Sequence, residues 1–392
     1  CMEFGIESET KDFVVERNGK RFIDLTKILP ERLPSGKLIL WKQIDEEKIE
    51  IFVDKHSAPG GNPKPIRIKR FIEINEDLFT LFGLWFGDGN RIRGGNWKAF
   101  GFANTEIELH KLFLSLCKKC LFIDPHQFFC AISVPLDFNG SIKELEEQVS
   151  RELKIPLGNF WKTIVNERRN LVHIDTRINS RLLSFSMKIL LEKLQKLALE
   201  EKRFSKSMLQ GIIASEANVH VRSDSGRLGE ISVAVEGEIK RNFVRNLFLN
   251  LGIKPSKDKT IEHQEAVLIH GLTNFKKVKE WNLIALHPKK LKDFERGLEG
   301  FKKEEFRKGE AKLLILKSLS KSSKNVSELA KELGRAWRSI VDHLWVLEDL
   351  ELVGRKRVGR KVFWFITERG KEMLEEKDVL EKLRIGLPRK NG

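Results

Sequence analysis

Two short segments of the chain are copies of one another, and this duplication constrains the fold more than any other feature. Residues 81–90 read LFGLWFGDGN and residues 209–218 read LQGIIASEAN. Each segment has an apolar helical pattern with small residues four positions apart, and an acidic residue follows at once. We therefore expect an α+β protein with two pseudo-symmetric α/β halves, at 71–200 and 201–305.

The residues that follow each copy predict the same order of elements, namely a turn, two strands and a helix. In the first half a strand at 98–103 precedes an amphipathic helix at 105–120. In the second half a strand at 231–235 precedes a helix at 238–251. Each half should end in another helix, and further strands are expected near 128–135, 171–178 and 258–270.

The segment before the first half, residues 1–70, is expected to be a small β-rich region. Apolar residues alternate in 37–41 and 49–53, and the Pro/Gly-rich stretch 57–63 interrupts any regular element. Nothing in this region predicts chemistry.

The repeated small residues are expected to bring two acids together. Gly83 and Gly87 in the first copy, like Gly211 and Ser215 in the second, line one helix face and allow two backbones to approach closely. The acids Asp88 and Glu216 directly follow the last small residue of each copy. If the helices pack in parallel, the two carboxylates meet.

Two carboxylates held together without cationic partners repel one another, and a divalent metal relieves the repulsion. We expect magnesium at Asp88 and Glu216, with Gly87 and Ser215 as further ligands. Such a metal could activate water and stabilise the leaving oxygen of a phosphodiester. The alternative is that each acid only caps its helix or is solvated.

These residues resemble the LAGLIDADG homing-endonuclease family, with the motif ending in Asp88 in the first copy and in a Glu variant, Glu216, in the second. The resemblance covers roughly residues 70–300. It implies two central motif helices, saddles of antiparallel strands on DNA, and magnesium-dependent cleavage of both strands of a long, nearly asymmetric target.

The resemblance also implies a basic residue or glutamine near each acid. Lys98, on the strand after the first motif, is our candidate for this additional catalytic residue. The other candidates are expected to contact DNA phosphates more often than to act in catalysis, and they are Arg91, Arg93, Arg227 and Lys289.

The C-terminal region, residues 306–392, is predicted to be a small helical module. Helices are expected at 312–319, 326–333 and 335–347, followed by a basic hairpin at 354–361 and a last helix after 363–370. The pattern resembles prokaryotic winged helix-turn-helix regulators, which implies that the second helix of the motif enters the DNA major groove.

Exposed side chains of this module are expected to bind DNA. In the helix-turn-helix they are Arg335, Trp337, Arg338 and His343, and in the wing they are Arg355, Lys356, Arg357, Arg360 and Lys361. The alternative is a winged module retained for protein interaction or dimerisation.

The composition agrees with a nucleic-acid partner. Lys and Arg number 72 against 56 Asp and Glu, so the formal net charge is +16, which favours polyanions. No apolar run approaches the roughly 20 residues of a membrane span, and cysteines are too few for a disulfide scaffold. We expect a cytoplasmic, nucleoid-associated monomer, and the abundance of Lys and Glu favours a thermophile.

Two apparent signals are excluded or discounted. Tyr is absent, which excludes recombinase or topoisomerase chemistry through a phenol nucleophile. Cys117, Cys120, His126 and Cys130 have a spacing close to a zinc knuckle, but we expect buried structural cysteines, because two of them end an amphipathic helix.

The sequence therefore predicts a double-strand DNA endonuclease. The first alternative is a LAGLIDADG-derived transcriptional regulator that binds DNA without cutting it, although the presence of both acids argues against it. The second is an RNA-splicing maturase, which the winged module disfavours because that fold binds duplex DNA.

Overall fold

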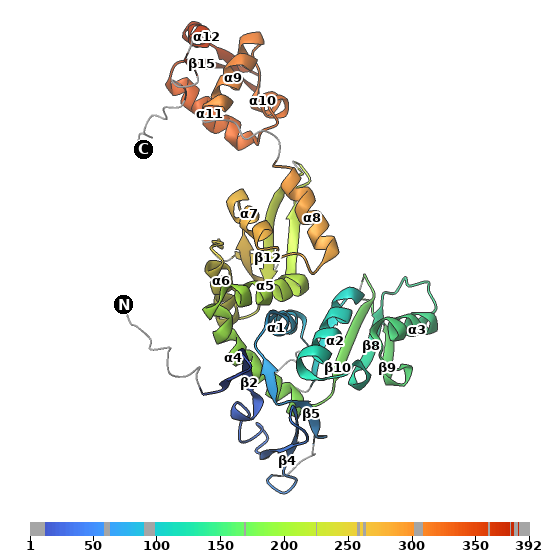
Figure 1. The fold of residues 1–392 in the computed structure, drawn as a ribbon. Helices are drawn as coiled ribbons and strands as arrows, with labels where there is room; N and C mark the ends of the chain where they lie inside the picture. Colours follow the sequence, from blue (N-terminus) through green and yellow to red (C-terminus); the bar gives the residue numbers. More distant parts are fainter. Residues whose placement is uncertain are drawn as a thin grey trace. The chain divides into compact units, whose positions relative to one another are not determined.

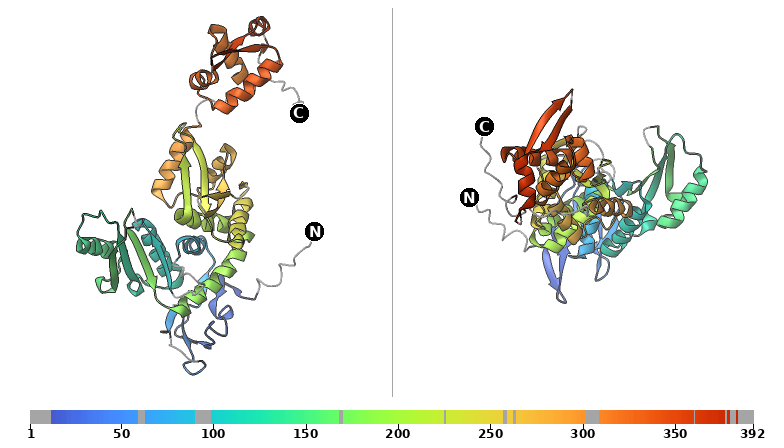
Figure 2. Two further views of the ribbon diagram at one scale, coloured as in Figure 1. Left: turned by 180° about the vertical axis from the view of Figure 1, so that it is seen from behind. Right: turned by 90° about the horizontal axis from the view of Figure 1, so that it is seen from above.

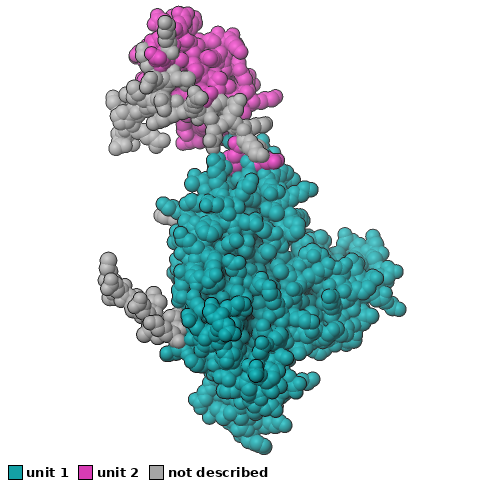
Figure 3. Space-filling model, viewed as in Figure 1, with its two compact units in different colours: residues 1–298 teal, residues 299–392 magenta. Residues whose placement is uncertain are grey.

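The computed structural model of the chain describes residues 12–58, 63–89, 99–167, 170–224, 226–256, 259–261, 264–301, 309–359, 361–376, 378–379 and 383. The chain forms two compact units, residues 1–298 and 299–392 (Figures 1 and 3). None of the helices in the described ranges combines the length and hydrophobicity needed to cross a membrane. The division predicted from the sequence, with boundaries at 70, 200 and 305, stays a prediction.

The N-terminal region contains two three-stranded antiparallel sheets, as the alternating sequence predicts. The strand orders are β1-β2-β6 and β3-β4-β5. The alternation within 48–53 buries every second side chain of β4. The strands are β1 (Val14–Arg17), β2 (Lys20–Asp24), β3 (Ile39–Gln43), β4 (Lys48–Val53), β5 (Ile66–Lys69) and β6 (Phe71–Glu73).

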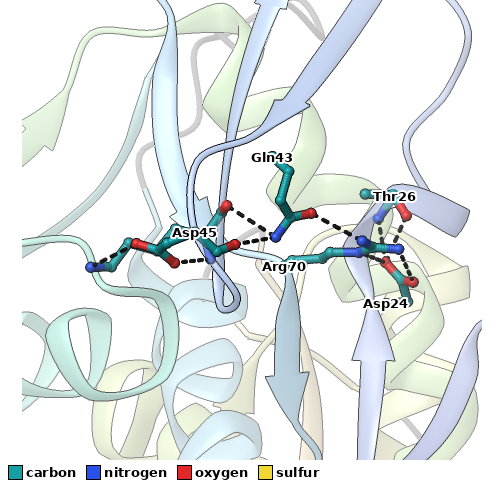
Figure 4. Close-up of polar contacts among 6 residues, drawn as sticks. Asp24, Thr26, Gln43, Asp45 and Arg70 are labelled. Carbon is teal, nitrogen blue, oxygen red and sulfur yellow. Dashed lines mark hydrogen bonds and ion pairs between the residues drawn. The ribbon is translucent and has the colours of Figure 1, made fainter.

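Arg70, between β5 and β6, joins the two sheets (Figure 4). Its guanidinium donates to both carboxylate oxygens of Asp24 on β2, at 3.2 and 3.1 Å, and to Oε1 of Gln43 on β3 at 3.0 Å. Burial raises the pKa of Asp24, but the hydrogen bonds from Arg70 and Thr26 outweigh it and lower that pKa overall. The hydrogen bonds of Arg70 therefore have a structural role, which is to link the two sheets.

The first half has the predicted helix, strand and helix after the motif, and an additional helix and strand. The sheet order is β7-β10-β8-β9. The elements are α1 (Glu76–Asp88), β7 (Phe100–Asn104), α2 (Ile107–Leu121), β8 (Phe129–Val134), α3 (Ile142–Leu153), β9 (Phe160–Val165), β10 (His173–Ile178) and α4 (Arg181–Glu200).

Strand β9 departs from the predicted antiparallel saddle, because it pairs with β8 in parallel. A parallel neighbour needs a crossover connection, and α3 provides it between the two strands. The other described pairs of this sheet, β7 with β10 and β10 with β8, are antiparallel as predicted. The sequence analysis assigned no element to 142–165, so it missed this extension of the sheet.

One face of the first sheet is covered by helices. Phe113 of α2 packs against Phe100 and Phe102 of β7. Helix α3 contacts α2 and accepts a hydrogen bond from Thr163 of β9 through Glu146, so both helices lie on the same face (Figure 2). The opposite face is called here the outer face of the first sheet.

The second half repeats this arrangement without the additional strand. Its sheet order is β11-β12-β14-β13, and every pair is antiparallel. The elements are α5 (Lys202–Glu216), β11 (Ala217–Val221), β12 (Leu228–Ala234), α6 (Glu238–Asn250), β13 (Lys259–Ile261), β14 (Gln264–Ile269), α7 (Leu272–Glu280) and α8 (Pro288–Glu299). The counterpart of β11 in the first half would fall at 90–98, outside the described residues.

The C-terminal unit is a winged helix-turn-helix, as predicted. Asn325 and Glu328 form a capping box that starts the first helix of the motif, and Ile340 and Leu344 of the second helix are buried in the core. The elements are α9 (Glu310–Lys321), α10 (Val326–Glu332), α11 (Trp337–Asp349), β15 (Val353–Val358), β16 (Lys361–Ile366) and α12 (Glu368–Glu375).

Candidate active site

The helices α1 and α5 are in backbone contact through their glycines. A Cβ atom at Gly83 would collide with the carbonyl oxygen of Met208, and one at Gly211 would lie 2.5 Å from the amide nitrogen of Leu84. Only glycine permits backbones to approach this closely. Towards the other end of the contact, Phe79 and Phe204 stack at 4.3 Å between ring centroids.

The order of these contacts shows that the two helices run in the same direction. Four residues after Gly83, a Cβ atom at Gly87 would collide with the hydroxyl of Ser215 and would lie 2.9 Å from Cγ of Glu216. Asp88 is the last residue of α1 and Glu216 the last of α5, and both are half-buried. The structure thus places the two acids at the same end of the helix pair.

Asn104, which the sequence analysis did not single out, orients the first acid. This residue ends β7, and its Nδ2 donates to Oδ2 of Asp88 at 2.5 Å. The backbone amide of Glu106 donates to Oδ1 of Asn104 at 2.8 Å, which fixes the orientation of the amide group. The only signal in the sequence was an amide residue at the end of the strand that follows the motif.

A buried histidine supports Asn104 from the side of α2. One ring nitrogen of His110 lies 3.3 Å from the carbonyl oxygen of Asn104, and the other lies 3.1 Å from Oγ1 of Thr176. Burial lowers the pKa of His110 to about 4, so the ring is neutral at physiological pH. It acts as a rigid hydrogen-bonding group and carries no charge.

Lys290 lies beside the second acid. Its Nζ donates to three carbonyl oxygens near the C-terminal end of α5, those of Ile213 at 3.1 Å, Ala214 at 2.7 Å and Ser215 at 3.3 Å. A helix C-terminus carries partial negative charge and its last carbonyls lack helical partners, so a cation is favourable there. The C-terminal end of the second motif helix is therefore capped by a lysine from α8.

The charge of Lys290 is coupled to the acids. Burial lowers the pKa of Lys290 to about 8, although the nearby Asp88, Glu216 and Glu106 favour its charged form. The sequence analysis had named Lys289 instead, and that side chain is exposed. The rotation of α8 about its own axis decides which of these two neighbouring lysines faces the acids.

His287 directly precedes α8 and is buried. Its Nδ1 accepts from the backbone amide of Lys290 at 3.4 Å. Burial, with a smaller contribution from the charge of Lys290, lowers the pKa of His287. The hydrogen bond between His287 and the backbone of Lys290 stabilises the first turn of α8, which carries Lys290.

The donors available for a metal at this end of the helices are few. Among the described residues there is no group of three or more His, Cys, Asp or Glu side chains able to hold an ion. The carbonyl oxygen of Ser215, one of the predicted ligands, already accepts from Lys290. Its hydroxyl is bonded within α5, to the carbonyl oxygens of Gly211 and Ile212.

Several basic residues named from the sequence cannot be placed at this site. Lys98, Arg91, Arg93 and Arg360 lie outside the described residues. Arg227 is half-buried just before β12. Their proposed roles stay predictions.

The cysteines of the apparent zinc knuckle are buried thiols. Burial raises the pKa of Cys120 and Cys130 to about 12 and also raises that of Cys117 well above its usual value, so all three are protonated at neutral pH. His126 is exposed and lies 3.7 Å from Asp124.

Most of the predicted DNA-binding residues of the winged unit are exposed, and one is engaged within the unit. Trp337 and Arg338 stand in the first turn of α11, where the side chains are 55% and 82% exposed. The guanidinium of Arg355 lies 4.7 Å from the ring of Trp345 and 3.1 Å from Glu348, so it stabilises the wing. The exposed wing residues also include Lys356, Arg357 and Lys361.

Two residues of the predicted set are less accessible. Arg335, in the turn before α11, is half-buried. His343 was expected to be exposed, but it is half-buried on α11, near the charges of Lys312 on α9 and of Arg335. Burial, followed by the charges of Lys312 and Arg335, lowers its pKa.

One family model matches part of the second unit. Residues 309–354 match the family described as bacterial regulatory protein, arsR family. No curated protein sequence matches the chain significantly.

Solved structures with similarity to the chain include LAGLIDADG-type proteins. The N-terminal LAGLIDADG domain of DUF199/WhiA is 12% identical, over 55% of this chain and 84% of that one, with a TM-score of 0.33. Full-length DUF199/WhiA from Thermatoga maritima is 10% identical over 70% and 90%, with a TM-score of 0.35. The homing endonuclease I-DmoI in complex with DNA and Mn is 13% identical over 52% and 96%, with a TM-score of 0.28.

Proposed function

We propose that the chain is a site-specific, metal-dependent endonuclease that cuts both strands of a long, nearly asymmetric DNA target. The glycine contact between α1 and α5 carries this proposal, because it brings Asp88 and Glu216 to one end of a parallel helix pair beside Lys290. A half-buried acid pair with a half-buried lysine contributes little to stability. Such an arrangement is typical of a functional site.

The two carboxylates fit magnesium, which proteins often bind through one or two carboxylates while water and substrate phosphates complete the shell. When bound, magnesium would supply Lewis-acid stabilisation of the phosphodiester oxygens. Asn104 would hold the Asp88 carboxylate in one orientation. Lys290, with a pKa of about 8, could hold or release a proton next to both acids at physiological pH.

The winged unit would add contacts outside the cleavage site. In such modules the start of the second motif helix meets base edges and the wing meets phosphates. Trp337 and Arg338 would take the first role, and Lys356, Arg357 and Lys361 the second. Arg355 would stabilise the wing through its contacts with Trp345 and Glu348.

Cleavage of a selected DNA target tests this proposal. Duplexes that bind the protein in calcium would be enriched from a randomised library and then incubated with the protein in magnesium. We expect double-strand cleavage by the wild type and none by Asp88→Asn or Glu216→Gln, which should both still bind in calcium. Asp77→Asn is the matched control, because Asp77 lies at the opposite end of α1 and pairs with Lys119.

The alternative function is a regulator that binds DNA without cutting it. Two observations favour it: Lys290 brings a positive charge to the acids, which reduces their need for a metal, and residues 309–354 match a family of regulatory proteins. Tight binding to the enriched duplex with no nicking in magnesium or manganese would establish this alternative.

A further inference from the structure

The outer face of the first sheet carries an arginine that the acid site does not use. Arg177 lies on β10, between the register partners Gly101 on β7 and Phe129 on β8. The preceding residue on the strand, Thr176, is buried under the helices, so alternation puts Arg177 on the opposite face. Phe129 is 38% exposed, which shows that this part of the face is open to solvent.

The guanidinium of Arg177 is held in place by two neighbours. It lies 4.5 Å from the ring centroid of Trp161, and its Nη1 lies 3.6 Å from Oδ2 of Asp175. Stacking on an aromatic ring and pairing with a carboxylate both restrict a flexible side chain before any ligand binds. Trp161 belongs to β9, the additional strand of the first sheet, which has no counterpart in the second sheet.

The glycine on the neighbouring strand keeps one flank of this arginine free of a side chain. A Cβ atom at Gly101 would lie 2.6 Å from both Cα and Cβ of Arg177. A larger residue on β7 would therefore displace the arginine from its present position.

The arginine also has hydrogen-bonding capacity that the fold does not use. Its Nε is buried, and among the described residues no acceptor lies within hydrogen-bonding distance of that atom. Buried donors without a partner are rare, so each one requires a reason. A ligand cannot reach this buried atom, but the Arg177 side chain is 22% exposed, so acceptors of a ligand can approach the rest of the guanidinium.

The neighbours of Arg177 favour a base edge over a phosphate as this ligand. The carboxylate of Asp175 reduces attraction for an anion, whereas it leaves the planar fork of donors available to neutral acceptors. In the major groove, guanine offers the acceptors O6 and N7, and an arginine fork bonded to both is the commonest specific contact.

We propose that Arg177 reads a guanine in the major groove of the DNA bound by the first half, and that Trp161 and Asp175 are its positioning residues. This inference rests on the proposed function, since it needs the outer face of the first sheet to contact duplex DNA. It adds the identity of one base and of the side chain that selects it.

Selection from a randomised duplex library tests the inference without requiring cleavage. The wild type in calcium should enrich a sequence with an invariant guanine at one position. Arg177→Gln and Arg177→Lys should lose that preference by about 10- to 100-fold while the rest of the sequence stays enriched. Lysine keeps the charge but not the fork, so a loss in Arg177→Lys separates base reading from general attraction.

Two further variants complete the design. Trp161→Ala should weaken the same preference less than the arginine variants do, because it removes only the support. Lys162→Ala, an exposed charge on the same strand, is the control, and it should lower affinity for all sequences alike.

The outcomes separate this inference from the proposed function. If the wild type enriches one sequence and both arginine variants enrich it with every preference intact, the reading of guanine is wrong and DNA binding stands. If the wild type enriches no sequence, both fall. Thermal unfolding of each variant, compared with the wild type, identifies any loss that comes from misfolding.

Discussion

The two halves share one helix motif but surround its acid differently. In the first half Asp88 accepts a hydrogen bond from Asn104, which the neutral His110 supports from behind. In the second half the strand that corresponds to β7 ends at Ala234, and a lysine caps the helix that ends in Glu216. The glycine contact needs both halves, whereas each half sets the surroundings of its own acid independently.

This difference leads us to expect that the two acids respond to partly different perturbations. The first is held by a neutral network, so it should respond to changes that break hydrogen bonds or protonate the histidine. Lys290, whose pKa is about 8, caps the helix of the second acid, but its charge interacts with both acids, so changes of charge in the alkaline range should affect both.

The largest expected effect comes from Lys290→Met. Loss of a positioned proton donor or acceptor typically lowers a rate by about 10²- to 10⁴-fold, so cleavage of the selected target should fall within that range. The wild-type rate should also change with an inflection near pH 8 that is absent from the variant. Lys289→Met is the matched control, and equal losses in both lysine variants would remove Lys290 from the site.

A bulky residue at either central glycine should destabilise the whole first unit. In Gly211→Leu and Gly83→Leu the added atoms meet backbone, which cannot move aside, so we expect a loss of about 3 kcal/mol or more in the free energy of unfolding. Urea denaturation measures this loss. Gly158→Ala, where nothing lies within 4 Å of an added Cβ, should change stability little. Markedly unequal effects at the two central glycines would contradict the symmetric contact.

The first half should be sensitive to acid because of His110. Its folded pKa of about 4 lies below the unfolded value of 6.5, so the unfolded chain binds a proton first as the pH falls. Stability should decrease between pH 6.5 and about 4, by up to about 3 kcal/mol at 1.36 kcal/mol per pKa unit. The free energy of unfolding, measured by denaturation at several pH values in this range, should depend less on pH in His110→Phe than in the wild type. An identical pH dependence in the two proteins would argue against a neutral buried ring.

The smallest effect is expected from Asn104→Ala. One hydrogen bond to a charged group contributes about 1.5–3 kcal/mol, but water can replace part of it at a half-buried acid. We therefore expect cleavage to fall by about 10-fold, with binding of the target in calcium unchanged. Ala234→Ser, at the end of the corresponding strand in the second half, should leave the rate nearly unchanged. A larger fall at Ala234 than at Asn104 would reverse the comparison between the halves.

The sequence by itself determined the repeated scaffold. The pattern of Gly83, Gly87, Gly211 and Ser215 predicted that two helices approach closely, and that Asp88 and Glu216 meet if the helices are parallel. The contacts show that the helices are parallel. The winged unit could also be predicted from the sequence, because a capping box, an apolar helical pattern and a basic hairpin are local signals. Local chemistry and periodicity are sufficient for such elements.

Only the tertiary structure decided what surrounds the acids and how wide each sheet is. Lys290 caps the C-terminal end of α5 from α8, far along the chain, and choosing it over Lys289 required knowing which residue of α8 faces the site. Asn104 and the parallel strand β9 were missed for the same reason. Their positions depend on contacts between segments that are distant in sequence, and a residue pattern carries no information about such contacts until the chain has folded.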